Sequence, residues 1–117
     1  MHTNRKIGEK GESIAAQFLL DKGFVIVERN WRTGHKEIDL ICKQADIYIF
    51  VEVKTRRNIS QGMPEESIST RKINSVTEAA RIYLYDKQYK DIRFDVIAIW
   101  LKQGEEVEIM HIQDAFY

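Results

Sequence analysis

Cysteine and proline each occur once in this chain of 117 residues, and its 18 basic and 18 acidic residues leave no formal net charge. The single cysteine, Cys42, excludes an intramolecular disulfide and favours a reducing compartment. The balanced charge argues against a protein that binds nucleic acid with its whole surface, although a local basic patch remains compatible with it. The three histidines (His2, His35 and His111) are scattered along the chain, so no zinc site is expected.

Long hydrophobic runs are also missing. The N-terminal segment 'MHTNRKIGEKGES' has no apolar core of the kind that signal peptides contain, and no run reaches membrane-spanning length. We therefore expect a cytoplasmic protein that does not associate with a membrane. The 44% hydrophobic and 31% charged content is typical of a soluble globular protein. The chain can bury roughly two-thirds of its unfolded surface, and we expect one domain over residues 1–117.

The hydrophobic pattern predicts seven elements. Helices are expected over residues 7–22 and 70–87, and Gly23 is a suitable residue to end the first. Strands are expected over residues 24–30, 36–42, 47–54, 93–101 and 106–112, with a loop over 55–67. The near-continuous apolar segment 'RFDVIAIWL' should be covered on both faces. This order predicts an α/β sandwich with a central mixed β-sheet flanked by helices.

Two charged residues interrupt the apolar strand 'IYIFVEVK'. Glu52 stands between Val51 and Val53, and Lys54 follows Val53 at the end of the predicted strand. Burying an ionised carboxylate or ammonium costs several kcal/mol unless the charge is paired or holds a metal. An isolated Glu-x-Lys is usually an exposed cross-strand ion pair, so the motif alone is a weak signal. Its apolar surroundings are what favour a functional interpretation.

Asp39, on the preceding predicted strand, can share a face with Glu52. If Gln44 and Ala45 form the hairpin loop, Asp39 lies diagonal to Glu52, and if Ala45 and Asp46 form it, the two lie directly opposite. Either register places both carboxylates within reach of one ion. A loop with an odd number of residues and no bulge would separate them.

Glu12 falls within the apolar arc of the first predicted helix, so its carboxylate should point towards the sheet. If that helix covers the face of Asp39 and Glu52, three carboxylates meet there. Oxygen ligands favour Mg²⁺ or Mn²⁺ and disfavour zinc. Lys54 could then orient an attacking water or stabilise a transition state. Carboxylates, Mg²⁺ and lysine together favour phosphodiester hydrolysis.

Other charged and aromatic residues have simpler interpretations. Asp95 is expected to form a structural salt link, with Arg93 or another basic residue, and not to be a metal ligand. Glu37 shares the face of Asp39 and is expected to be structural, with a supporting role at the site left open. Cys42 and Trp100 are expected in the core. Trp31 either packs against the sheet, which is favoured, or stacks on an unpaired base.

Four basic residues flank the loop that follows the predicted site, namely Arg56, Arg57, Arg71 and Lys72. Such a cluster is compatible with a solvated surface and equally with phosphate contacts. Lys72 lies at the edge of its helix's apolar stripe, and the favoured interpretation is a long side chain that covers apolar surface while its charge reaches solvent. We carry all four residues as candidate nucleic-acid contacts.

The motifs 'EIDLI' and 'FVEVKTR', with 'GEKGESIAAQFLLDKGF' before them and 'RFDVIAI' after them, closely resemble the uncharacterised bacterial YraN family. That family looks like the archaeal Holliday junction resolvases and the wider restriction-endonuclease-like PD-(D/E)xK nucleases. The resemblance covers nearly the whole chain and implies a restriction-endonuclease-like nuclease domain. It implies that Glu12, Asp39, Glu52 and Lys54 are catalytic, with the three acids as metal ligands. One departure is Lys36, which stands where the family usually has glycine.

Three functions compete at this point. The leading hypothesis is a Mg²⁺-dependent endonuclease acting on DNA, including branched or otherwise structured DNA, and the intact Asp39, Glu52 and Lys54 favour it. The second is a nucleic-acid-binding module with a nuclease fold that lacks catalysis or depends on a protein partner, which the neutral net charge favours. The third is an assembly subunit with the C-terminal 'DAFY' as a docking tail. Resolvase-like relatives act as dimers, which implies a homodimer here.

Overall fold

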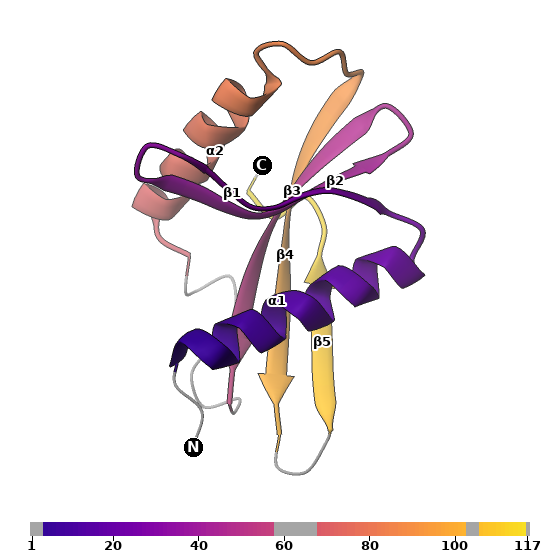
Figure 1. The fold of residues 1–117 in the computed structure, drawn as a ribbon, viewed down its shortest axis with the longest axis vertical. Coiled ribbons are helices and arrows are strands. Elements are labelled where there is room, and N and C mark those ends of the chain that lie inside the picture. The colour runs from indigo at the N-terminus through magenta and orange to yellow at the C-terminus, as the bar shows by residue number, and fades with distance from the viewer. Residues whose placement is uncertain (1–3, 58–67, 103–105, 117) are drawn as a thin grey trace.

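The computed structural model describes residues 4–57, 68–102 and 106–116. These residues form a five-stranded sheet in the order β1-β2-β3-β4-β5, with a helix against each face (Figure 1). Only β3 and β4 pair in parallel, and the other neighbours are antiparallel. The elements are α1 (Asn4–Asp21), β1 (Val25–Thr33), β2 (Lys36–Gln44), β3 (Ile47–Arg56), α2 (Thr70–Leu84), β4 (Asp91–Leu101) and β5 (Val107–Ile112). The predicted α/β sandwich with a mixed sheet flanked by helices is confirmed.

The end of α1 follows the sequence prediction. The Gly23 N–H bonds the Leu20 carbonyl and the Phe24 N–H bonds the Leu19 carbonyl, each at 3.0 Å. This pair of bonds is the Schellman motif, and Gly23 adopts the φ of 91° that the motif requires. The helix starts at Asn4, earlier than the predicted residue 7.

Several boundaries differ from the prediction. β1 and β3 continue to Thr33 and Arg56, whereas α2 stops at Leu84 instead of residue 87. β3 is longer because it pairs with β4 as far as the Arg56–Trp100 pair. Residues 55 and 56, expected in a loop, therefore belong to a strand, and residues 58–67 of that expected loop lie outside the described residues. Within the described parts of the chain, neither helix is long and apolar enough to cross a membrane.

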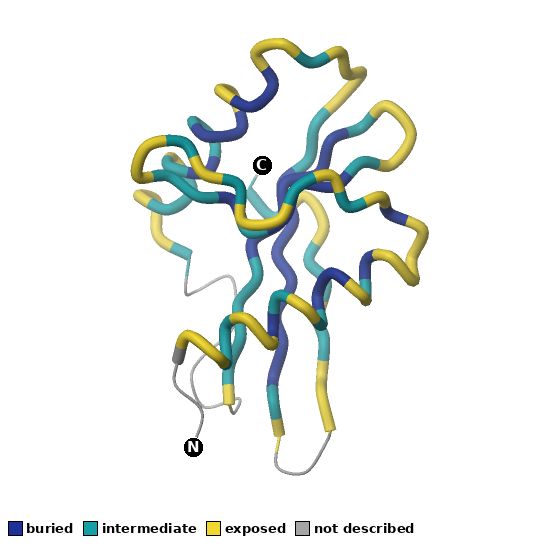
Figure 2. Tube along the Cα trace, viewed as in Figure 1, coloured by how far each residue is buried: buried dark blue, intermediate teal, exposed yellow. Residues whose placement is uncertain are grey.

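The two faces of the sheet carry separate hydrophobic cores, so the central strands are buried on both sides (Figure 2). The α1 core contains Ala15, Ala16, Leu19, Phe24, Leu40, Cys42, Ile49, Val51, Ile97 and Ile99. The α2 core contains Ile38, Ile41, Tyr48, Phe50, Val76, Ala79, Ala80, Tyr83, Leu84 and Phe94. β4 is buried from Phe94 to Trp100, as its apolar sequence predicts, and Cys42 and Trp100 are confirmed as buried residues.

Side chains along β2 do not alternate regularly at Asp39. Leu40 packs in the α1 core, whereas Ile38, two residues before it, packs in the α2 core. Residues two apart in a regular strand point to the same face. The paired register between β2 and β3 also ends at the Leu40–Val51 pair. We conclude that β2 turns away from β3 at Asp39.

The neighbouring strand β1 is irregular at the same level. Asn30 lies between the pairs Arg29–Leu40 and Trp31–Ile38 and has a φ of 51°. Asparagine adopts this left-handed region more readily than most residues. Irregularities in strands redirect side chains and are frequent beside functional sites. Both strands thus change direction where the carboxylates of interest lie.

α1 approaches β3 closely at Gly11. A Cβ atom at this position would lie 2.9 Å from Thr55 Cβ and would clash with Thr55 Oγ1. Thr55 is near the end of β3, next to Lys54. Glycine therefore sets the separation of α1 from β3, and the following residue, Glu12, is held beside the same strand.

Gly11→Ala should destabilise the protein by about 1–3 kcal/mol, because the added methyl group overpacks the contact with Thr55. Gly8→Ala is the matched control, since a Cβ at Gly8 would meet no atom within 4 Å among the described residues outside its own stretch of helix. Alanine favours helices over glycine by up to about 1 kcal/mol, so Gly8→Ala should be neutral or stabilising. Urea denaturation of both variants measures the difference. Equal stability of the two variants would rule out the close approach.

Candidate functional site

The β2–β3 hairpin brings Asp39 level with Glu52, just beyond the last paired residues of the two strands, Leu40 and Val51. Its turn is the two-residue loop Ala45-Asp46, in which Ala45 has a φ of 54°. Continuing the observed register of the two strands brings position 39 level with position 52. Of the two registers considered from the sequence, the directly opposed one is therefore correct.

The Asp39 carboxylate occupies the place where β2 and β3 part. Its Oδ2 accepts a hydrogen bond of 2.9 Å from the Val53 backbone N–H. The Asp39 side chain thus accepts the hydrogen bond that a backbone carbonyl of β2 would accept from β3 if the pairing of the two strands continued. Burial raises the pKa of Asp39, while the bond from Val53 and the charges of Lys72 and Lys54 oppose that rise.

Glu52 is the more deeply buried member of the pair, with only 2% of its surface exposed. Its Oε2 lies 3.4 Å from Lys72 Nζ, whereas its Oε1 is buried without a hydrogen-bond partner among the described residues. Burial, followed by the charge of Asp39, raises the pKa of Glu52 from 4.5 to about 8. A buried carboxylate oxygen without a partner is unusual in a folded protein.

The expectation that α1 covers the face of Glu52 is wrong. Phe50, two residues earlier on β3, packs in the α2 core, and Lys72 of α2 pairs with Glu52. α1 instead packs against the alternate residue Val51. Strand alternation predicts which residues share a face, but the path of the chain between elements decides which helix covers that face.

Glu12 approaches Asp39 from the α1 face. Burial raises its pKa, and the next largest cause is the charge of Asp39. With the Asn30 amide oriented to satisfy its neighbours, Asn30 Nδ2 donates to Glu12 Oε1 and to Glu37 Oε1 at 3.0 Å each. Asp39 is therefore the carboxylate that neighbours both Glu12 and Glu52. Within residues 4–57, 68–102 and 106–116, no three acidic, histidine or cysteine side chains are gathered in one metal-holding group.

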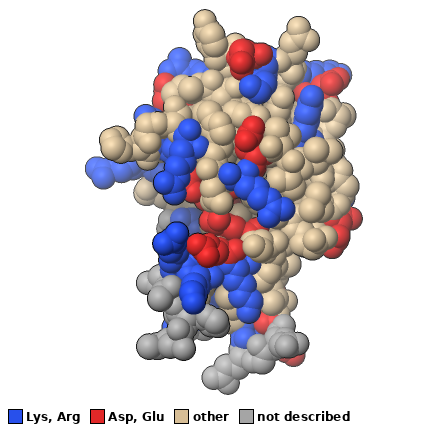
Figure 3. All heavy atoms as spheres, in the orientation of Figure 1, with Lys and Arg blue, Asp and Glu red and all other residues tan. Residues whose placement is uncertain are grey.

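Three adjoining hollows lie along the N-terminal half of α1, and Glu12 lines all of them. Their volumes are about 380, 140 and 520 Å³. The basic side chains that line them are Arg5, Arg29, Arg32, Lys54 and Arg56. Figure 3 shows this face, with acidic atoms bordered by Lys and Arg side chains. The hollows thus combine an acidic centre with a basic border.

The predicted basic contacts occupy different places around the site. Lys54 lines the hollow that contains Glu12, and its charge opposes the rise in the pKa of both Asp39 and Glu52. Arg56 lines the same hollow. Arg57 and Arg71 are exposed. Lys72, by contrast, is directed at Glu52 and lies in the first turn of α2.

The structural interpretations of the other acidic residues hold. Asp95 is fully buried and receives bonds of 2.8 and 2.9 Å from Arg93. It also contacts His111 Nε2 at 2.7 Å, and His111 Nδ1 lies 2.9 Å from Lys22 Nζ, contacts that no sequence signal indicated. Glu37 pairs with the exposed Arg32 at 3.2 Å.

Trp31 and Phe116 both pack against other aromatic rings. Trp31 lies edge-on to Tyr83 at 5.1 Å, which agrees with packing against the sheet. Phe116 of the 'DAFY' segment stacks on Phe94 at 5.6 Å. That segment folds back on the domain as far as Phe116, and residue 117 lies outside the described residues.

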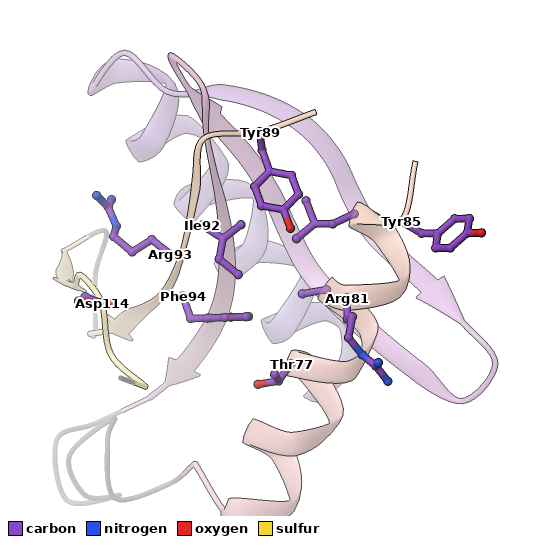
Figure 4. Close-up of a pocket in the computed structure, with 10 residues that line it drawn as sticks. Thr77, Arg81, Tyr85, Tyr89, Ile92, Arg93, Phe94 and Asp114 are labelled. Atoms are coloured by element: carbon purple, nitrogen blue, oxygen red, sulfur yellow. The ribbon is translucent and has the colours of Figure 1, made fainter. Parts of the chain in front are cut away.

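A separate cavity of about 540 Å³ lies between the C-terminal half of α2 and β4. Its inner lining is mostly apolar and includes Ile92, Phe94 and Tyr89, whereas Arg81 and Tyr85 point away from it (Figure 4). Among the described residues that line it, Asp114 is the only carboxylate. The chemistry of the chain therefore points to the region around Asp39 and Glu52.

Comparison with known proteins identifies the family. Residues 11–99 match the uncharacterised protein family UPF0102. The chain is 45% identical over 116 residues to a UPF0102 protein of Dictyoglomus turgidum, covering 97% of this chain and 98% of the relative. It is 40% identical over 118 residues to a UPF0102 protein of Rhodococcus jostii, covering 99% of this chain and 100% of the relative.

A solved structure, Pyrococcus furiosus SfsA in complex with Ca²⁺, is 15% identical with a TM-score of 0.44, covering 93% of this chain and 63% of that chain. The family match covers most of the sequence, and the relatives match it almost from end to end. The chain therefore belongs to the uncharacterised protein family UPF0102, the YraN family that its motifs predict.

Proposed function

We propose that this protein is a Mg²⁺-dependent endonuclease that hydrolyses phosphodiester bonds in DNA, including branched or otherwise structured DNA. The observation that carries the proposal is the Glu52 carboxylate, buried beside the charge of Asp39 with one oxygen that lacks a hydrogen-bond partner among the described residues. Replacing such a buried ionisable group by an apolar residue is often stabilising. A chain that keeps the carboxylate pair therefore has a use for it.

The donor set fits a small divalent cation. Asp39 and Glu52 would hold Mg²⁺ or Mn²⁺ through carboxylate oxygens, the ligands that these ions prefer. The unpartnered Oε1 of Glu52 is an available donor. Glu12 lies on the other side of Asp39 and, among the described residues, is not gathered with the pair into a group of three ligands. When bound, the cation supplies Lewis-acid stabilisation of the charge on a scissile phosphate.

The chain's own residues would act from both faces of the sheet. Lys54 lines the hollow with Glu12 and can orient an attacking water or donate a hydrogen bond to the phosphate in the transition state. Glu12, whose pKa burial and Asp39 raise, can accept a proton from a water in that hollow. Arg56 and the other arginines of the border, together with the exposed Arg57, would hold backbone phosphates.

A second candidate is a nucleic-acid-binding module that lacks catalysis or works only with a protein partner. The contact between Lys72 and Glu52 favours it, because a buried carboxyl group with a raised pKa and an ammonium beside it can persist without a cation. The basic border would then bind phosphates without hydrolysis. In either case we propose DNA as the partner, and a homodimer would match the two symmetric strands of a four-way junction.

Glu52→Gln should remove a pH dependence from the stability of the metal-free protein. The pKa of Glu52 is raised from 4.5 to about 8, so the folded parent retains a proton that the unfolded chain releases. The parent's free energy of unfolding should fall by a few kcal/mol between about pH 5 and about pH 8. Urea denaturation across this range should show little of that fall in Glu52→Gln. The small fall in the free energy of unfolding that remains in Glu52→Gln comes from Asp39, whose pKa is also raised.

Glu108→Gln is the matched control for this experiment. Glu108 is 55% exposed on β5 and bonds Lys102 at 2.6 Å, so its replacement should leave the pH dependence of the parent in place. Mn²⁺ added at high pH should raise the melting temperature of the parent and the control but not of Glu52→Gln. The same pH dependence in all three proteins would contradict the assigned charge state of Glu52.

Lys54→Ala should lower the rate of cleavage far more than it lowers affinity. Loss of one donor to the transition state typically costs about 100-fold or more in rate. Arg56→Ala should instead weaken DNA binding and reduce its salt dependence by about one unit of slope. Single-turnover cleavage at saturating DNA with Mn²⁺ measures the first effect, and binding across a salt series measures the second.

The substrates for this comparison are duplexes, forks, single strands and four-way junctions. A Lys54→Ala protein that cuts as fast as the parent at saturating DNA excludes the catalytic role of this lysine. A parent that binds these substrates and cuts none of them, with Mg²⁺ or Mn²⁺ present, favours the binding module over the nuclease.

A further inference from the structure

Lys72 is held at the site by the start of α2. Ser69 is the N-cap of the helix, and its Oγ accepts a hydrogen bond of 3.1 Å from the Lys72 backbone N–H. This cap fixes the backbone of the first turn. From there the Lys72 ammonium reaches Glu52 Oε2 at 3.4 Å. The same helix terminus contributes a partial positive charge of its own.

The ammonium acts on both carboxylates of the pair. Lys72 lowers the pKa of Asp39 as well as that of Glu52, which places its charge near both side chains. Its side chain is 38% exposed, whereas that of Glu52 is 3% exposed. The lysine therefore enters the site from solvent and can withdraw without opening the core. Glu52, by contrast, is fixed in the centre of the sheet.

A divalent cation on Asp39 and Glu52 would have to occupy this same neighbourhood. Two cations close to one buried carboxylate repel each other strongly, because their charges are poorly screened there. The contact between Lys72 and Glu52 and a cation on Glu52 are therefore competing states. This step rests on the proposed metal-dependent function.

We propose that Lys72 and a divalent cation exchange on Glu52. In the metal-free protein the ammonium lies against Glu52, and when a cation binds, the ammonium is released towards solvent. The released ammonium lies beside Arg71 on the first turn of α2, where a phosphate that accompanies the cation is its natural new partner. Lys72 thus makes phosphate binding and metal binding support each other.

The test compares Mn²⁺ affinity in Lys72→Met and in the parent, by calorimetry without nucleic acid. Methionine retains the length of the lysine stem and removes its charge. Lys72→Met should bind Mn²⁺ about tenfold more tightly, because no ammonium has to be displaced. Arg71→Met is the matched control, since it removes one positive charge from the adjacent exposed residue and should shift the affinity by less than about twofold.

The outcomes separate this inference from the proposed function. Tighter binding by Lys72→Met alone supports the exchange, including the case in which the parent binds no measurable Mn²⁺. Equal or weaker binding by Lys72→Met, with clear binding by the parent, overturns the exchange and leaves the metal-dependent function standing. Absence of Mn²⁺ binding in both proteins overturns the metal-dependent function and the exchange together.

A second measurement follows the ammonium itself. Acetylation of Lys72 by an amine-reactive ester, quantified by mass spectrometry, should be several-fold faster with saturating Mg²⁺ than without it. Lys87, paired with Asp86 beyond the end of α2, serves as the internal control and should not respond. An unchanged rate at Lys72 under conditions where Mg²⁺ binds would show that the lysine stays on Glu52, and would overturn its release.

Discussion

The burial of the Glu52 carboxylate in the middle of the sheet is the constraint around which the site is arranged. β3 lies between β2 and β4 and is covered on both faces, so water cannot solvate this charge. A carboxylate in such a place must be protonated, paired or bound to a cation. Its raised pKa, the ion pair with Lys72 and the proposed cation site are three responses to the same lack of solvent.

The separation of β2 from β3 at Asp39 makes this buried position accessible. If the ladder continued, backbone bonds would close the gap and Asp39 would point to one face only. Because the Asp39 carboxylate takes the Val53 N–H instead, it lies between the strands and neighbours groups on both faces. Glu12 comes to it from the α1 side, and Glu52 with Lys72 comes from the α2 side. The site therefore spans the sheet.

Local patterns predicted much of this arrangement. The period of the strands placed Asp39 and Glu52 together, and the apolar surroundings of Glu52 marked it as unusual. The face covered by each helix was not predictable in the same way, because it depends on how the chain crosses between distant elements. The irregularity at Asn30 and the pairing of Lys72 with Glu52 likewise depend on contacts between segments far apart in sequence. Strand ends were underestimated where a partner strand extends the ladder, as at Arg56.

The neutral net charge argues less against nucleic-acid binding than the sequence alone suggests. The carboxylates of Glu12, Asp39 and Glu52 are wholly or partly buried, whereas Arg5, Arg29 and Arg32 are exposed at the border of the hollows. A phosphate backbone on this face would meet the exposed basic charges first. The carboxylates at the centre of the hollows repel the phosphates. A cation bound to these carboxylates would turn that repulsion into attraction. Local placement of charge, and not its sum, decides whether a polyanion can approach this site.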